Sequence, residues 1–101
     1  MRPIHLARMD KTRPVLVLTR AAVRDRMMRV TVAPITSRAR GLTTELRVGA
    51  ANGLDHDSVV SLDNIGTIAV GELGRQVGFL RDDQEMALTT AIHAAFDLDR
   101  I

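Results

Sequence analysis

The strongest constraint on the fold is a change of hydrophobic period near residue 80. Before it, short runs of aliphatic and β-branched residues are separated by turn residues; after it, apolar residues recur at helical spacing. A chain of 101 residues is expected to form one domain, residues 1–101. Several short strands followed by one terminal helix predict a mainly β fold with a C-terminal helix, built as a small, strongly bent sheet or barrel.

The expected elements follow from this pattern. Strands are predicted at 2–7, 14–19, 29–35, 42–48, 58–62 and 67–70, whereas the two glycines in 73–80 predict a short or bent segment there. Pro34 is expected at a strand end or on an edge, because proline cannot donate to a ladder. Asp82 is the predicted N-cap of the helix, with Glu85 three residues later. Leu88, Ile92 and Phe96 form its predicted buried face.

Composition narrows the function classes. The chain has no cysteine, which excludes disulfides and thiolate metal cages and fits a cytoplasmic protein. No apolar run is long enough to predict a membrane span. Of the 14 basic residues, 13 are arginine, whose guanidinium binds phosphate bidentately, although GC-rich coding produces the same bias. With Phe79 and Phe96 as the only aromatic residues, a base-stacking platform is not expected.

A candidate site emerges where two predicted strands meet. Arg13 stands at the start of the 14–19 strand, and Thr36 and Ser37 follow the 29–35 strand, ahead of Arg38 and Arg40. If these strands pair antiparallel, Arg13 lies beside Thr36, and the sheet presents guanidinium and hydroxyl groups without a carboxylate. Such a surface suits a phosphodiester. The alternative is ordinary loop chemistry, in which these residues have no shared role.

Four segments carry a resemblance to a known family: "KTRPVLVLTR", "VTVAPITSRARGLTTELRV", "NGLDHDSVVSLDNIGTI" and "LGRQVGFL". In this order they closely resemble the MazF/PemK family of toxin endoribonucleases, over residues 4 to 98. The resemblance implies an SH3-like barrel with a C-terminal helix, assembled as a homodimer. It also implies cleavage of single-stranded RNA at short sequences without metal or other cofactor, and neutralisation by a MazE-like antitoxin.

The resemblance also assigns site residues. The family's catalytic arginine and threonine fall on Arg13 of "RPVLVL" and Thr36 of "APIT". The predicted RNA-binding residues around them are Lys11, Thr19, Ser37, Arg38 and Arg40. The implied reaction is attack by the ribose 2′-hydroxyl, leaving 2′,3′-cyclic phosphate and 5′-hydroxyl ends. Neither Arg13 nor Thr36 titrates near neutrality, so a separate base is needed, and His5 is the candidate. The spacing of the carboxylates predicts no metal site.

Two departures from the family and two alternative functions stand beside this interpretation. The loop before "RPVLVL" is shorter than usual in the family, and Gly66 replaces an arginine that members often carry. The first alternative is a gyrase-poisoning toxin of the CcdB type, which shares the fold but binds a protein and cleaves nothing. The second is a degenerate member that only binds RNA or antitoxin.

Overall fold

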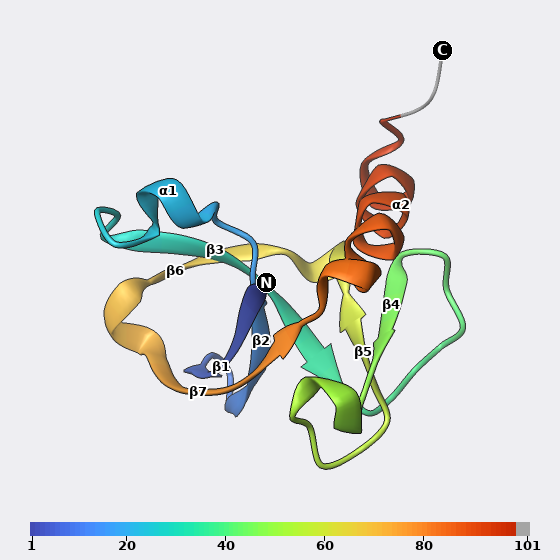
Figure 1. Ribbon diagram of the computed structural model, residues 1–101, viewed down its shortest axis with the longest axis horizontal. Coiled ribbons are helices and arrows are strands. Elements are labelled where there is room, and N and C mark those ends of the chain that lie inside the picture. The colour runs from blue at the N-terminus through green and yellow to red at the C-terminus, as the bar shows by residue number, and fades with distance from the viewer. Residues whose placement is uncertain (99–101) are drawn as a thin grey trace.

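The computed structural model describes residues 1–98 and consists of one bent β-sheet with a C-terminal helix (Figure 1). Its strands are β1 (Arg2–Arg8), β2 (Thr12–Val17), β3 (Arg29–Thr36), β4 (Glu45–Val48), β5 (Ser58–Ser61), β6 (Gly66–Ala69) and β7 (Leu73–Leu80). The helices are α1 (Ala21–Arg24) and α2 (Glu85–Phe96), with short 3₁₀ turns at Ala50–Asn52, Leu62–Asn64, Val70–Glu72 and Asp82–Gln84. The predicted mainly β class with a C-terminal helix is confirmed. No helix within residues 1–98 is long and apolar enough to cross a membrane.

The strand order β4-β5-β3-β2-β1-β7 makes β3 the strand on which the sheet bends. Its first half pairs with β6 through residues Arg29 to Val32, and its end pairs with β5 through Ile35 and Thr36. Pro34 therefore lies inside a central strand, not at its end or on an edge as predicted. This position is tolerated because it falls between the two pairings, where the missing N–H removes no ladder hydrogen bond on that side.

Two apolar clusters form the core. The larger one contains Ile4, Leu16, Ile35, Leu46, Val60, Leu80 and Leu88, and lies between the β4–β5 side of the sheet and α2. The smaller contains Ala7, Val15, Val17, Val30 and Val32, next to Ile68. Successive residues of β2 thus serve different clusters, as the alternating direction of side chains along a strand requires. Packing of both faces of β2 fixes the position of its first residues.

The strand predictions differ from the structure mainly at their ends. β2 starts two residues earlier and ends before Leu18, and β4 starts at Glu45, because residues 42–44 form a turn. The 73–80 segment is a full strand that pairs with β1 through two register shifts, so it is bent but not short. The four-residue helix α1 was not predicted, since four residues are too few to show a helical period.

Helix α2 corrects two further predictions. Asp82 is not its N-cap: the helix is preceded by a 3₁₀ turn, its capping residue is Gln84, and Asp82 lies 3.6 Å from the N-terminal amine of Met1. Phe96 is exposed, whereas Leu88 and Ala91 are buried and Ile92 is partly buried. Ala95 still packs against the core, but Phe96, the last residue of the helix, extends past it.

Asn52 ties the 50–56 loop to β7 and α2. It is 2% exposed, and its amide nitrogen donates to the Phe79 carbonyl (2.9 Å) and to Gln84 Oε1 (2.6 Å) while Gly49 N–H donates to its Oδ1 (3.1 Å). Gly53 follows with a φ of +87°, and a Cβ at Gly78 would overlap the Asn52 carbonyl. The close approach of these backbones requires glycine at both positions.

We predict that Asn52→Ala lowers the free energy of unfolding by about 2 kcal/mol, because it leaves buried polar groups without partners. Urea denaturation measures the change. Asn64→Ala is the matched control, since Asn64 is exposed and bonds only Ser61 Oγ (2.8 Å); it should change stability by about 0.5 kcal/mol or less. Equal losses in the two variants would contradict the role assigned to Asn52.

Candidate active site

The antiparallel pairing of β2 and β3 brings Arg13 and Thr36 together, as predicted. The register pairs Val15 with Pro34 and Leu16 with Ala33. Continued by two residues, it places Arg13 opposite Thr36, and directly opposed residues of antiparallel strands project on the same face. The side chain of Arg13 is only 22% exposed. A guanidinium is thus held on the sheet next to a hydroxyl.

Two cavities meet at these residues. The first, of about 540 Å³, lies between the β1–β2 turn, the end of β3, the 53–58 loop and β7; the second, of about 560 Å³, lies between the β1–β2 turn and the 38–45 loop. Of residues 1–98, Arg13 and Thr36 are the two that line both cavities. A ligand that passes from one cavity to the other must therefore cross the guanidinium and the hydroxyl.

Arg13 is held by a carboxylate that the sequence analysis did not anticipate. Its Nη2 donates to both oxygens of Asp10, at 2.9 and 3.0 Å, from the tip of the short β1–β2 turn. The prediction of a surface without carboxylates is therefore wrong. Desolvation acts to raise the pKa of Asp10, but the Lys11 backbone N–H and the charge of Arg13 outweigh it, so this pKa lies below its ordinary value. The Asp10 carboxylate thus contacts Arg13 Nη2 in the way that an oxyanion ligand would.

Arg13 nevertheless keeps binding capacity. Its Nε is buried and has no hydrogen-bond partner among residues 1–98. Buried N–H groups without partners are rare, and this one belongs to a side chain that lines both cavities. Nε and Nη2 form the edge of the guanidinium that grips two oxygens of one phosphate.

Thr36 is positioned by a local turn. Its Oγ1 accepts a hydrogen bond from the Arg38 backbone N–H at 3.1 Å. One acceptor site of the hydroxyl is thereby used, while its proton remains free to be donated. Thr36 can consequently donate to an oxyanion in either cavity.

The remaining predicted RNA-binding residues divide between the cavities, with one exception. Lys11 and Ser37 line the first cavity, and Arg38 and Arg40 line the second. Thr19 lines neither: it follows the opposite end of β2, and its Oγ1 accepts a hydrogen bond from the Thr31 backbone N–H at 2.8 Å. Six residues of extended chain separate Thr19 from Arg13, about 20 Å.

His5 is also outside both cavities. Its Nδ1 lies 2.9 Å from the Gly74 carbonyl, across the β1–β7 pairing. In the β1–β2 register His5 lies opposite Val15 and Ala7 lies opposite Arg13, so His5 and Arg13 project on the same face of the sheet, two positions apart. The His5 ring lies against the Gly74 carbonyl of β7 and lines neither cavity, so the structure does not place it among the residues around Arg13 and Thr36.

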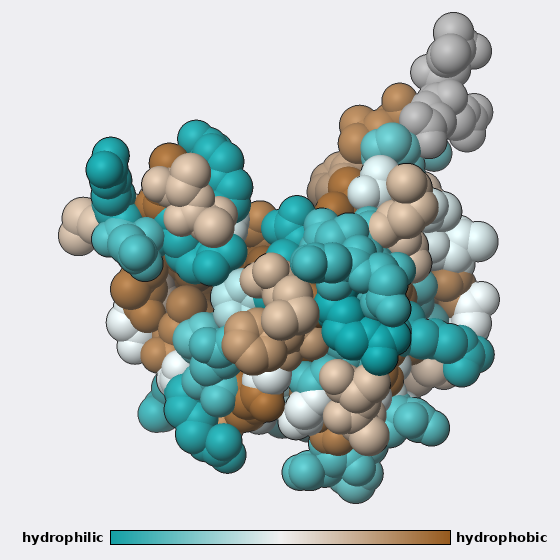
Figure 2. All heavy atoms as spheres, in the orientation of Figure 1, coloured by the Kyte–Doolittle hydropathy of each residue, from teal (hydrophilic) through white to brown (hydrophobic). Residues whose placement is uncertain are grey.

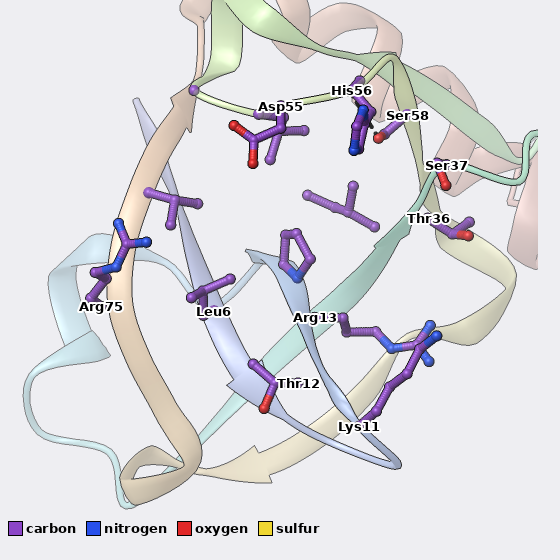
Figure 3. Close-up of a pocket in the computed structure, with 15 residues that line it drawn as sticks. Leu6, Lys11, Thr12, Arg13, Thr36, Ser37, Asp55, His56, Ser58 and Arg75 are labelled. Carbon is purple, nitrogen blue, oxygen red and sulfur yellow. Dashed lines mark hydrogen bonds between the residues drawn. The ribbon is translucent and has the colours of Figure 1, made fainter.

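The structure adds residues to the first cavity that the sequence analysis did not select. Figure 3 shows Asp55, His56 and Ser58 along one side, opposite Lys11, Thr12 and Arg13, with Arg75 of β7 at a third side. The turn signal at Asn52-Gly53 located this loop in the sequence. Its contact with the β2–β3 site depends on the packing of Gly53 against Gly78, which no local pattern encodes.

The second cavity contains charges of both signs. Arg38 and Arg40 line it together with Asp10, Glu45 and Asp63. The Glu45 carboxylate accepts from the backbone N–H groups of Arg40 (3.1 Å) and Leu42 (3.1 Å), which fixes the loop. Among residues 1–98, no group of three or more histidine or carboxylate side chains is arranged to hold a metal ion.

Comparisons with known proteins identify the family. Residues 3–96 match the family described as PemK-like, MazF-like toxin of type II toxin-antitoxin system. The endoribonuclease MazF3 of Mycobacterium tuberculosis (strain CDC 1551 / Oshkosh) is 61% identical over 99 residues, covering 98% of this chain and 96% of the relative.

Two solved structures share the fold. Mycobacterium tuberculosis toxin MazF-mt6 superposes with a TM-score of 0.94 and 59% identity, covering 95% of this chain and 97% of that one. An endoribonuclease in complex with its cognate antitoxin, from mycobacterial species, has a TM-score of 0.84 at 23% identity and covers 95% and 92%. By sequence over almost its whole length, and by fold, the chain belongs to the PemK-like, MazF-like toxins of type II toxin–antitoxin systems.

Proposed function

We propose that this protein is an endoribonuclease toxin that cleaves single-stranded RNA at the wall shared by its two cavities. The observation that carries the proposal is that, in the part of the chain that the structure describes, Arg13 and Thr36 alone line both cavities. The scissile phosphate lies against them, and the flanking nucleotides extend into the cavity on either side. The resemblance to relatives named as endoribonucleases supports this function over a gyrase poison or a non-catalytic binder.

The chemistry proposed for the site is internal transesterification. The ribose 2′-hydroxyl attacks phosphorus, the bond to the 5′ oxygen breaks, and 2′,3′-cyclic phosphate and 5′-hydroxyl ends form. Negative charge accumulates on the non-bridging oxygens in the transition state. Arg13 offers Nε and Nη2 to these oxygens and Thr36 offers its hydroxyl proton, so both stabilise the transition state more than the ground state. No cofactor enters this scheme, and the reaction takes place in the cytoplasm, where RNA is available.

We predict that Arg13→Ala lowers RNA cleavage at least about 100-fold, because one preorganised donor to a developing oxyanion contributes that much. A long single-stranded RNA incubated with protein and excess EDTA, followed by end-group analysis, measures rate and product chemistry. Thr36→Ser should retain most activity, whereas Thr36→Ala should lose it.

Arg26→Ala provides the control for loss of one positive charge. Arg26 is exposed and follows α1, at the end of β2 and β3 opposite the site. Cleavage by this variant should equal that of the wild type. Intact RNA with a mobility shift would support the non-catalytic binder, and inhibition of gyrase without any effect on RNA would support the CcdB-like alternative.

The Asp10–Arg13 ion pair generates a second prediction. An RNA phosphate must displace the Asp10 carboxylate from Nη2, so Asp10→Asn should bind a non-cleavable 2′-deoxy analogue several-fold more tightly. Asp25→Asn removes the same charge from the C-terminal end of α1 and serves as the control. Fluorescence anisotropy at constant salt measures both affinities. Equal affinities in the two variants would show that Asp10 does not compete with the ligand.

Two partners are proposed in addition to RNA. The first is an antitoxin whose acidic, apolar segment covers the same cavities. A protein of the same fold has been solved in complex with its cognate antitoxin, which supports an antitoxin as the class of partner. The second is another copy of this chain. Exposed apolar side chains such as Met28, Phe79 and Phe96 provide surface that a second copy would cover.

Sedimentation and competition test both partners on one sample. The protein alone should sediment at about twice the 11.1 kDa chain mass. An acidic antitoxin-derived peptide should then displace labelled RNA analogue, because both ligands need the guanidinium of Arg13. A monomer at micromolar concentration would contradict the dimer, and simultaneous binding of peptide and RNA at full affinity would contradict the shared site.

A further inference from the structure

The proposed reaction needs a proton donor that Arg13 and Thr36 do not provide. A 5′ alkoxide is a poor leaving group unless it is protonated as it departs. A guanidinium holds its proton above a pKa of about 12, and a threonine hydroxyl does not titrate near neutrality. Imidazole is the side chain whose ordinary pKa, about 6.5, suits proton transfer at physiological pH.

Of the three histidines, His56 is the one that faces the site. It lines the first cavity together with Arg13 and Thr36. Figure 3 shows its ring on the 53–58 loop, extending into the cavity from the side opposite Arg13. His5 lies against the Gly74 carbonyl of β7 and lines neither cavity, and His93 lies on α2, away from the cavity.

The backbone that carries His56 is fixed while its ring is left available. The Ser58 hydroxyl donates to the His56 carbonyl at 3.0 Å, and Asn52 and Gly53 anchor the start of the loop to β7. The ring itself has no hydrogen-bond partner among residues 1–98 and is exposed to the cavity. The His56 imidazole is therefore held in position by its backbone and is available to a ligand, and it does not stabilise the fold through a hydrogen bond of its own.

The two cavities also differ in the groups that could exchange a proton with a ligand. The second cavity has the carboxylates Asp10, Glu45 and Asp63, which only accept when ionised, beside arginines. The first cavity contains the donors His56 and Lys11, and its other charged side chains are Arg13, Asp55 and Arg75. In an in-line displacement the attacking and leaving oxygens lie on opposite sides of phosphorus. The leaving oxygen therefore faces the first cavity.

We infer that His56 is the general acid of RNA cleavage, an inference that rests on the proposed function. The protonated imidazole gives its proton to the 5′ oxygen as the P–O5′ bond breaks. The 2′-hydroxyl proton is lost to solvent on the second-cavity side as the 2′-oxygen–phosphorus bond forms.

The test compares two substrates that differ in one atom. His56→Ala should cleave an ordinary RNA oligonucleotide about 100-fold more slowly than wild type. An oligonucleotide with sulfur in place of the scissile 5′ oxygen releases a thiolate, which leaves without protonation. On that substrate His56→Ala should come within a few-fold of wild type, whereas Arg13→Ala should remain defective. His93→Gln is the matched histidine control and should cleave ordinary RNA normally.

Each outcome decides the inference. Recovery of His56→Ala on the sulfur substrate alone, with unchanged affinity for the 2′-deoxy analogue, supports the general acid. Wild-type cleavage of ordinary RNA by His56→Ala overturns it, and so does an equal loss on both substrates, which assigns His56 to substrate positioning. If the wild-type protein cleaves neither substrate, the proposed function itself fails, so the two failures are distinguishable.

Discussion

The antiparallel register between β2 and β3 is the constraint on which the site depends. It is set by the burial of Val15, Leu16 and Val17 on both faces of β2, because a slip of one residue would turn every side chain to the opposite face. With the register fixed, Arg13 and Thr36 have no freedom to separate. The site is therefore a consequence of core packing a few residues away, and it is positioned by strands instead of by mobile loops.

Charge balance around Arg13 gives the site its second property. A half-buried guanidinium without a counter-charge would be costly, and Asp10 supplies that charge in the ligand-free molecule. Asp10 is the exposed member of the pair, so an incoming phosphate can replace its carboxylate at Arg13. The guanidinium then stays paired with an anion, and the carboxylate is released to solvent. Asp10 accepts two hydrogen bonds, both from Nη2, and leaves the buried Nε without a partner, so a phosphate that bonds both nitrogens would satisfy a donor that the carboxylate does not.

The arginines of this chain are not all part of the site. Arg13, Arg38, Arg40 and Arg75 line the cavities, whereas Arg20, Arg24, Arg26 and Arg29 surround α1 at the other end of β2 and β3. Figure 2 shows hydrophilic side chains on the projecting α1 lobe as well as on the body of the molecule. Arg24 serves the fold there by donating to the Thr19 carbonyl at 3.3 Å. The number of arginines in the sequence therefore exceeds the number at the candidate site. Only their positions in the fold distinguish the arginines that line the cavities from those around α1.

The sequence by itself determined the β class, the terminal helix and the meeting of Arg13 with Thr36, because strand periodicity and the pairing of neighbouring strands are local properties. It did not determine the Asp10 ion pair, the bend of the sheet at Pro34 or the exposure of Phe96. It placed His5 at the site and overlooked His56. These features depend on contacts between segments distant in the chain: the 53–58 loop reaches the cavity only because Gly53 packs against Gly78, and the His5 ring lies against the Gly74 carbonyl of β7. Tertiary packing, with no local signature in the residues concerned, decided that His56 and not His5 lines the first cavity.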